Sequence, residues 1–526
     1  MVSGEPSGTA PRFVTGVQTG VDPDWRVFEV VQTWPERADA DSVHFSGVNL
    51  GHAVRRGVMQ ALAAIVRPIA YPELAERDAQ FRETWGLDAA TSGVEHRLRR
   101  ALKHTVIPNT LGRLGHTATG VRARRIRAST SAPRLLVKST SRLDALIHAE
   151  SFDFPGDIIV AGTSGSEAGK HPFVPVRPEA PPARSQFTKF RHALQQGLRD
   201  SGYELDSATA DAIVDEARFE AARIKAIQHT LDALEPNAIL LHDDTTPEGL
   251  TWALAAKAHG IAAITVAHGL DCERFFLDPV YASAKCVWGP DRAERIRATA
   301  RRLSGDQSHE PHVHVTGNPA YDGVAPARET GTGGLRWLWV TRPHTPRKCL
   351  TPGRFPVEGA DILEALFGAL RHMPSAQLTI KPHPADYSRI YSRMASNAGL
   401  NDRVTLRHDS LAHLFASTDV VIAEDSTAAL DACLAGKPIV HAHFAPTPPV
   451  LPLGEMKAAL PGREPEQLSK SLHTASRPAR DFQTITAYEQ ATFIQATAPV
   501  ANGSAIHAIC DHTNEVLPAY HSTPSL

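Results

Sequence analysis

The sequence lacks a surplus of charge, paired cysteines and long apolar runs, and each absence narrows what the protein can be. Lys and Arg number 55 against 57 Asp and Glu, for a formal net charge of −2, which argues against a nucleic-acid binder driven by bulk charge. The five cysteines are scattered without a CxxC pair, so neither a disulfide framework nor a cysteine zinc site is indicated, and we expect small buried or partly buried residues. No stretch approaches the roughly 18 uninterrupted apolar residues of a membrane span, and the N-terminus lacks the features of a signal peptide. These absences predict a cytoplasmic protein.

The length of 526 residues is too great for one ordinary core and favours two or three domains. The first part, 1–130, shows no clear fold beyond a helix expected at 49–68. From Arg97 to Lys138 the chain has eleven Lys and Arg and no Asp or Glu. This basic stretch could contact anionic lipid at the inner face of a membrane or an anionic acceptor, or it could be an ordinary solvated surface. Peripheral membrane contact therefore stays open.

From residue 236 onward, short apolar runs alternate with helical patterns. "NAILLHDD" (237–244) predicts a buried strand, "TTPEGLTWALAAKAHG" (245–260) a helix capped by Thr246, and "IAAITVAHG" (261–269) a second strand. A second series of the same kind runs over residues 335–442. Strands that alternate with helices indicate parallel sheets covered on both faces.

The predicted fold class is therefore α/β, with two Rossmann-like domains whose parallel sheets face a cleft. We expect four segments, namely an N-terminal region of unclear fold (1–130), an acceptor-side Rossmann-like domain (131–325), a nucleotide-donor Rossmann-like domain (326–480) and a C-terminal helical segment (481–526).

Unusual polar residues stand where the expected strands end. Ligands of open parallel sheets bind beyond the carboxyl ends of the strands. The groups at five such ends are His268 and Gly269, Gly317 and Asn318, Arg342 and His344, Lys381 and His383, and Asp425 to Thr427. We predict that these strand ends face one cleft.

The chemistry that these residues suggest is the binding of a nucleotide phosphate. Ser426 and Thr427 open a helix, where free backbone N–H groups and the positive end of the helix dipole attract an anion, although simple capping is the alternative. His383 stands between two prolines that restrict the backbone, and its ring could donate to a phosphate oxygen or protonate it. Asp431 lies one turn into the same helix, where a ribose could reach it or where it could be a plain exposed acid.

Several motifs resemble a known family. "VTGNPAYD", "IKPHP", "EDSTAALDACLAGKPIV" and "AHGL" are similar to motifs of GT-B glycosyltransferases of capsule-polysaccharide and teichoic-acid synthesis, including CDP-glycerol glycerophosphotransferases. The resemblance covers about 236–445. It implies that His383 contacts the donor phosphate, that Ser426 and Thr427 bind the same group, and that His268 is a candidate catalytic base.

Weaker likenesses extend to bacterial sialyltransferases and to non-hydrolysing UDP-GlcNAc 2-epimerases. The sialyltransferases carry an acid-Asp-Gly motif, whereas Asp243 and Asp244 are not followed by Gly here. The epimerases carry a "HVEAGLR"-type run and a Ser-Gly-Gly phosphate loop, whereas this chain has "VAHGLDCER" and "DSTAALDA". Both departures favour a transferase of the first kind.

The predicted function is a transferase that moves a group from a CMP-, CDP- or UDP-linked donor to a glycan or polyol-phosphate acceptor. Arg342, Lys381 and His383 would stabilise the leaving phosphate. His268, or less favourably Asp244, would take the proton of the acceptor hydroxyl. The alternatives are a UDP-sugar 2-epimerase and a non-catalytic nucleotide-binding subunit.

No metal or cofactor is expected for this reaction. "HAH" (441–443) puts two imidazoles on one side of a strand, but no acid lies near them in the sequence. We therefore assign His441 and His443 a structural role.

Overall fold

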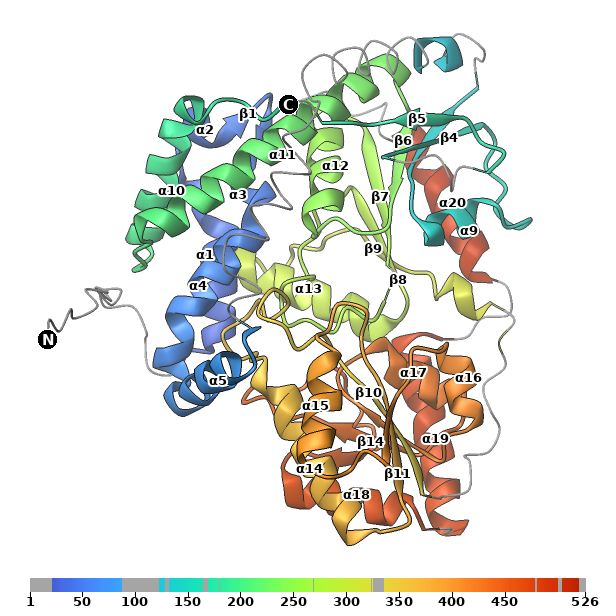
Figure 1. The fold of residues 1–526 in the computed structure, drawn as a ribbon. Coiled ribbons are helices and arrows are strands. Elements are labelled where there is room, and N and C mark those ends of the chain that lie inside the picture. Colours follow the sequence, from blue (N-terminus) through green and yellow to red (C-terminus); the bar gives the residue numbers. More distant parts are fainter. Residues whose placement is uncertain are drawn as a thin grey trace, which may run out of the picture.

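The computed structural model describes residues 21–87, 123–127, 132–163, 169–178, 180–267, 269–322, 324, 335–477, 480–499 and 504–519. The described chain forms two α/β domains, one above the other in Figure 1. Part of the basic stretch, 97–122, and the candidate base His268 lie outside the described residues.

The first domain is built on a seven-stranded sheet in the order β5-β4-β3-β6-β7-β8-β9, and each neighbouring pair is parallel. Its strands are β3 (Arg134–Lys138), β4 (Asp157–Gly162), β5 (Phe173–Pro175), β6 (Ala238–Leu241), β7 (Ala262–Val266), β8 (Ala284–Val287) and β9 (Val313–Val315). Its helical elements are α9 (Ser141–Ile147), η1 (Arg184–Phe187), α10 (Thr188–Asp200), α11 (Ser207–Leu234), α12 (Pro247–Ala258), α13 (Pro290–Ser304) and η2 (Pro319–Tyr321). All residues of β6, β7 and β8 are buried, as expected for central strands covered by helices on both faces.

The second domain is built on a six-stranded sheet in the order β12-β11-β10-β13-β14-β15, and it is also parallel throughout. Its strands are β10 (Arg336–Val340), β11 (Gln377–Lys381), β12 (Val404–Leu406), β13 (Val420–Ala423), β14 (Ile439–Ala442) and β15 (Leu460–Gly462). Its helices are α14 (Val357–His372), α15 (Arg389–Asn397), α16 (Leu411–Ala416), α17 (Thr427–Leu434) and α18 (Pro465–Ala475). The order places β10 and β13 at the centre, so their carboxyl ends lie in the middle of the domain edge.

The described part of the N-terminal region is mainly helical and touches both domains. Its elements are α1 (Pro23–Arg37), α2 (Ala40–Val43), β1 (His44–Phe45), β2 (Val48–Asn49), α3 (Leu50–Ala53), α4 (Arg55–Ala70) and α5 (Pro72–Thr84). Helix α1 packs on α4 and α10, whereas α5 packs on α14 of the second domain. The helix expected at 49–68 is confirmed over most of its length, but it is interrupted at Val54, so the chain forms α3 and α4 in its place.

The C-terminal segment contains two helices that belong to different domains. Helix α19 (Arg480–Thr497) packs on α17 and on α13, and α20 (Ser504–Ala519) packs on β6 and β7. The backbone of Thr497 comes so close to Gly289 that a Cβ there would lie 2.3 Å from its carbonyl oxygen. Only glycine allows this contact between α13 and the end of α19.

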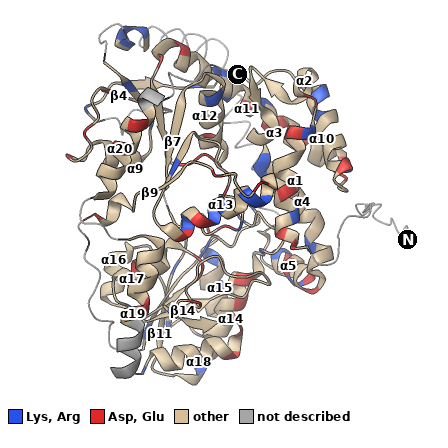
Figure 2. Ribbon diagram, turned by 180° about the vertical axis from the view of Figure 1, so that it is seen from behind, with Lys and Arg blue, Asp and Glu red and all other residues tan. Residues whose placement is uncertain are grey.

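The predicted fold class is confirmed: the chain is α/β, with two parallel sheets covered by helices. The strands of the two sheets fall within 131–325 and 326–480, but the four predicted domain boundaries stay predictions. Lys, Arg, Asp and Glu are spread over both domains, with both signs along α13 (Figure 2). Among the described helices, none has the length and apolar character needed to cross a membrane.

Candidate active site at the edge of the second sheet

The order of the second sheet brings three of the unusual strand ends together and places the end of β14 beside them. Strands β11, β10, β13 and β14 are neighbours in that order. Arg342 and His383 stand two residues after β10 and β11, Asp425 and Ser426 stand two and three residues after β13, and His443 directly follows β14. A loop of the first domain, 269–276, reaches this edge, and we call it the bridging loop. The candidate site therefore lies between the two domains.

Ser426 is the residue whose surroundings point most clearly to a ligand. It is the N-cap of α17 in extended backbone conformation, yet its side chain makes no capping bond. Its Oγ atom is buried and has no hydrogen-bond partner among the described residues. A buried hydroxyl without a partner costs stability, so a ligand oxygen at the start of α17 would satisfy it.

Thr427 connects the same helix to the first domain. Its Oγ1 accepts a hydrogen bond from the backbone N–H of Leu270 at 3.3 Å. A Cβ on Gly269 would lie 3.1 Å from this oxygen, so the bridging loop passes closely over the start of α17. Thr427 is thus placed at the predicted site, but its hydroxyl is engaged by the protein.

His383 is an exposed residue with one ring nitrogen hydrogen-bonded within its own turn. Its Nδ1 accepts from the N–H of Ala385 at 3.1 Å, so in the neutral ring Nε2 carries the proton. The backbone N–H of His383 donates to Thr341 Oγ1 at 2.9 Å and fixes the turn. Burial, followed by the positive charges of Lys348 and Arg342, lowers the pKa of His383. The ring is therefore a neutral N–H donor near pH 7.

Arg342 ties the two domains together. The residue is buried, and its Nη2 donates to the carbonyl oxygen of Cys272 at 2.8 Å and lies 3.4 Å from Glu273 Oε1. Arg354 donates to the same Glu273 oxygen at 2.6 Å. Burial opposes ionisation of Glu273, but Arg354 and Arg342 together hold its pKa below the ordinary value. The acid and two guanidinium groups form a buried ionic contact across the domain boundary.

Two of the predicted donor-binding residues are directed elsewhere. The Lys381 ammonium donates to the carbonyl oxygen of Asp409 at 2.7 Å. Asp431 accepts a hydrogen bond from the Tyr321 hydroxyl at 2.5 Å, and burial raises its pKa. Asp431 therefore contacts the first domain through η2, and its predicted proximity to a ribose stays a prediction.

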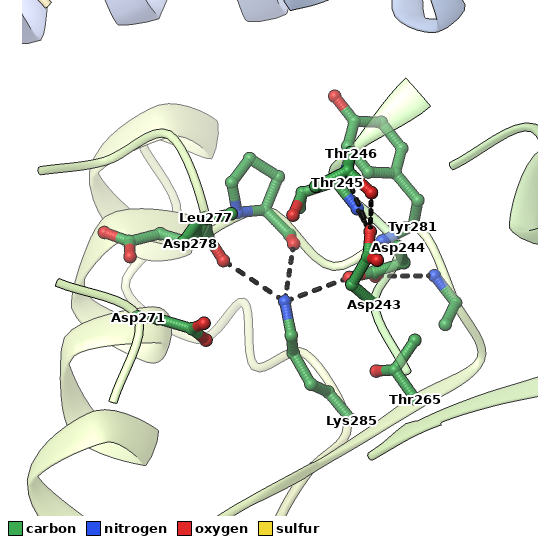
Figure 3. Close-up of polar contacts among 12 residues, drawn as sticks. Asp243, Asp244, Thr245, Thr246, Thr265, Asp271, Leu277, Asp278, Tyr281 and Lys285 are labelled. Atoms are coloured by element: carbon green, nitrogen blue, oxygen red, sulfur yellow. Dashed lines mark hydrogen bonds and ion pairs between the residues drawn. The ribbon is translucent and has the colours of Figure 1, made fainter. Parts of the chain in front are cut away.

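Asp244 is held in a buried network at the end of β6 (Figure 3). Its Oδ1 lies 3.0 Å from Lys285 Nζ, and its Oδ2 accepts from the N–H groups of Tyr281 and Ala282 at 2.7 and 3.0 Å. Lys285 also donates to the carbonyl oxygen of Leu277 at 3.1 Å. With no exposed surface, the Asp244 carboxylate fits a role in holding the chain before β8 better than the predicted role of a base.

Asp243 beside it also serves the local structure. Its Oδ1 accepts from the backbone N–H of Thr246 at 2.8 Å and from that residue's hydroxyl at 2.5 Å. Thr246 is the N-cap of α12 as predicted, but its own side chain makes no capping bond. Asp243 thus supplies the acceptor that the helix start requires.

The candidate base His268 is not among the residues that the structure describes, but the residues on both sides of it make defined contacts. The carbonyl oxygen of Ala267 accepts from Trp288 Nε1 at 2.9 Å, and Gly269 contacts Thr427. The flanks of His268 therefore lie at the domain boundary beside the start of α17.

Sequence reasoning missed the acidic partner of the "HAH" histidines. Asp425 Oδ1 lies 3.2 Å from His441 Nε2, and its Oδ2 lies 3.5 Å from His443 Nδ1. Burial acts against ionisation of Asp425, but the hydrogen bond with His441 and the charge of Arg342 hold its pKa well below the usual range. The acid stands sixteen residues before His441, and only the pairing of β13 with β14 brings them together. Among the described residues, these three form the group whose ligand atoms lie close enough together to hold a metal ion.

A family model described as "Capsule polysaccharide biosynthesis protein" matches residues 348–445. This segment contains His383, Ser426 and Thr427, together with the Asp425 cluster. The predicted resemblance to capsule-polysaccharide proteins is confirmed over this part of the chain. In the comparison with curated proteins, no sequence matches.

Several solved structures are similar to the chain. S. aureus MnaA with UDP has a TM-score of 0.44 and 13% identity, over 75% of this chain and 99% of that one. The UDP-GlcNAc 2-epimerase of Neisseria meningitidis bound to UDP-GlcNAc has a TM-score of 0.42 and 13% identity, over 74% and 100%. The wall teichoic acid polymerase TagF with CDPG has a TM-score of 0.38 and 11% identity, over 82% and 100%.

Proposed function

We propose that the protein is a glycosyltransferase or polyol-phosphate transferase of bacterial glycan synthesis. It moves a group from a CMP-, CDP- or UDP-linked donor to a hydroxyl of a glycan or polyol-phosphate acceptor. The observation that carries the proposal is the buried, unpartnered hydroxyl of Ser426 at the start of α17, beside the strand ends of His383 and Arg342. The capsule-polysaccharide match over 348–445 supports the same class of chemistry.

The donor phosphate would bind at the start of α17. The free backbone N–H groups of the helix and the Ser426 hydroxyl supply hydrogen-bond donors, and the helix dipole adds a positive field. His383 adds its Nε2–H, which is already a donor because Nδ1 accepts from Ala385. These donors stand in place before the bond breaks, so they stabilise the charge that develops on the leaving phosphate.

Arg342 would contribute its positive charge from the domain boundary. Its guanidinium is shared between the Cys272 carbonyl, Glu273 and, at 3.7 Å, Asp425. A phosphate arriving at Ser426 competes with these groups for the same cation. The proposal therefore includes a rearrangement of the bridging loop when the donor binds. To bind the donor, Lys381 would have to leave the carbonyl oxygen of Asp409, and Asp431 would have to leave the Tyr321 hydroxyl.

The acceptor hydroxyl would lose its proton to His268. An imidazole of ordinary pKa is mostly neutral at pH 7 and can accept a proton. The support is positional, because the residue directly after His268 contacts Thr427 at the start of the donor helix. Asp244 is the less favoured base because its carboxylate is buried and bound to Lys285.

The transfer step as proposed needs no metal and no cofactor. The helix start and Arg342 supply positive charge, and the neutral His383 ring supplies a hydrogen-bond donor, where a GT-B transferase needs them. Proton removal from the acceptor needs only an imidazole.

The proposal is tested by nucleotide binding followed by turnover. A thermal-shift screen with CMP, CDP, UDP and GDP should show a raised melting temperature for at least one of the first three nucleotides, because a ligand of the folded state stabilises it. The corresponding activated donor should then be hydrolysed slowly in water and consumed faster with an acceptor. Interconversion of UDP-sugars without an acceptor would instead favour an epimerase, and binding without any turnover would favour a non-catalytic subunit.

A further inference from the structure

The cluster of Asp425, His441 and His443 has the composition of a metal site. Their exposed fractions are 1%, 2% and 8%. One donor atom from each residue lies within 4.8 Å of the others. His441 and His443 are two residues apart at the end of β14, so both rings project to the same side of the strand. Asp425 follows the neighbouring strand β13 and faces them.

The hydrogen bond of His443 fixes which of its nitrogens can bind a cation. Its Nε2 lies 2.6 Å from the carbonyl oxygen of Thr447. A carbonyl oxygen only accepts, so Nε2 carries the proton. In the neutral ring, Nδ1 then presents a lone pair to Asp425 Oδ2 at 3.5 Å. Two acceptors face each other across this gap, and a cation between them would bind both. A metal-bound histidine typically donates its other N–H to such a carbonyl.

Two of the distances within the cluster suit a tetrahedral ion. Zn–N and Zn–O bonds of about 2.0–2.1 Å place neighbouring ligand atoms of a tetrahedron about 3.3 Å apart. The two contacts of Asp425 with the histidines measure 3.2 and 3.5 Å. Charge-assisted hydrogen bonds would be shorter, at about 2.7–2.9 Å.

The Asp425 carboxylate has room for an ion. The N–H groups of Val450 and Leu451 each donate to one of its oxygens, at 2.9 and 3.1 Å. A carboxylate has about four acceptor positions, so each oxygen retains one. A cavity of about 20 Å³ lies against Asp425 and His443. This volume suffices for one water molecule, which could complete the coordination of an ion.

The charges around this cavity leave a negative remainder. Arg274, Arg342 and Arg354 line it. They are offset by three carboxylates, since Arg274 binds Asp22 and Asp24 while Arg342 and Arg354 share Glu273. Glu424 pairs with His344. Burial raises the pKa of Glu358, and Asp425 has Arg342 no nearer than 3.7 Å, so a divalent cation at Asp425 would be a closer balancing charge.

We propose that Asp425, His441 and His443 bind one divalent cation of the zinc class, with the Thr447 carbonyl orienting His443. The ion joins the ends of β13 and β14 and holds the loop 443–451 against Asp425, the residue directly before Ser426. Its role is structural, so the proposal is independent of the transferase function. Asp425, His441 and His443 are part of the segment 348–445, but the phosphate donors proposed above are different side chains.

The experiment measures metal binding by protein produced without a histidine tag. The chain is stripped with a chelator, and Zn²⁺ or Co²⁺ is then added while metal content and melting temperature are followed. We expect one equivalent per chain, a raised melting temperature, and for Co²⁺ the intense visible absorption of a tetrahedral site. These measurements on the unaltered chain need neither a nucleotide nor an acceptor, so they are separate from the test of transfer.

Two variants locate the site. His443→Ala should weaken binding at least about 100-fold, because even loss of an orienting partner costs 10- to 100-fold. His413→Ala is the matched control, since His413 is exposed on α16 and should leave binding unchanged. His443→Gln serves if the alanine variant does not fold. No saturable uptake by the unaltered chain, or equal uptake by the unaltered chain and a folded His443 variant, would overturn the proposal.

Discussion

Ser426→Ala gives the sharpest test of the donor site, because the fate of this hydroxyl distinguishes ligand binding from capping. The Ser426 Oγ has no described partner in the protein. Its removal should therefore change the free energy of unfolding by no more than about 0.5 kcal/mol. A hydrogen bond from the hydroxyl to a charged phosphate contributes about 1.5–3 kcal/mol, so the nucleotide dissociation constant should rise roughly 10- to 150-fold.

Ser410→Ala is a matched control in the same domain. Ser410 is the N-cap of α16, and its hydroxyl accepts from the N–H of His413 at 3.3 Å. Loss of this cap should lower the free energy of unfolding by about 1 kcal/mol and leave nucleotide affinity unchanged. The two variants should thus show opposite patterns.

The assay combines urea unfolding with isothermal titration of the nucleotide that the thermal-shift screen selects. The reasoning is refuted if Ser426→Ala binds nucleotide as tightly as the unaltered chain. It is also refuted if Ser426→Ala loses as much stability as Ser410→Ala, because the hydroxyl would then be an ordinary helix cap.

Three further predictions concern turnover and the thiols. His383→Ala should lower both transfer and donor hydrolysis by a factor on the order of a hundred; an unchanged rate of either, measured by nucleotide release, would make the Pro-His-Pro turn architectural. His268→Ala should abolish transfer and keep nucleotide affinity, as measured by calorimetry; loss of affinity would assign His268 to the donor site instead. Burial raises the pKa of Cys286 and Cys349 to about 12, so both thiols should resist alkylation at pH 8 until the chain unfolds. Rapid alkylation of the native chain, followed by mass spectrometry, would contradict this resistance. Because the folded chain holds these thiol protons more tightly, the contribution of the two thiols to the free energy of unfolding should be lost as pH rises from about 9 toward 12.

The strands of the second domain were readable from the sequence because their apolar runs are bounded by turn residues. "LTI" before Lys381 and "VVIA" before Glu424 coincide with β11 and β13. The segments on either side of both strands have helix and turn propensities that agree with the structure, so the local sequence was sufficient to predict the two strands. The prediction of buried or partly buried cysteines is likewise confirmed, since four are buried and Cys272 is partly buried.

The N-terminal region was unreadable because its helices are set by distant contacts. Trp34 of α1 is fully buried and packs edge-to-face on Phe190 of α10, more than 150 residues away. Pro35 lies inside the same helix and gives the sequence the look of a helix end. Tertiary packing overrides this signal, and the sequence alone does not show the partner.

Side-chain directions at the site were the hardest to predict. Arg342 follows β10 and Lys381 is the last residue of β11, yet Arg342 donates to Cys272 of the first domain and Lys381 to Asp409 nearby. Long flexible cations take the carbonyl oxygen that the folded chain offers them. The contact of Asp425 with His441 forms because β13 and β14 are adjacent strands. The strand order that is common in doubly wound sheets could have suggested this adjacency from the sequence.

The exchange of helices between the domains makes the two halves of the chain mutually dependent. A break between Val324 and Leu335 would separate the sheets into two polypeptides. The first fragment would keep α5, which covers α14 of the second sheet, and the second would keep α20, which covers β6 and β7 of the first. Each fragment would hold a piece of its partner's core, so a nicked chain should remain one particle, and the halves should fold when produced together rather than separately.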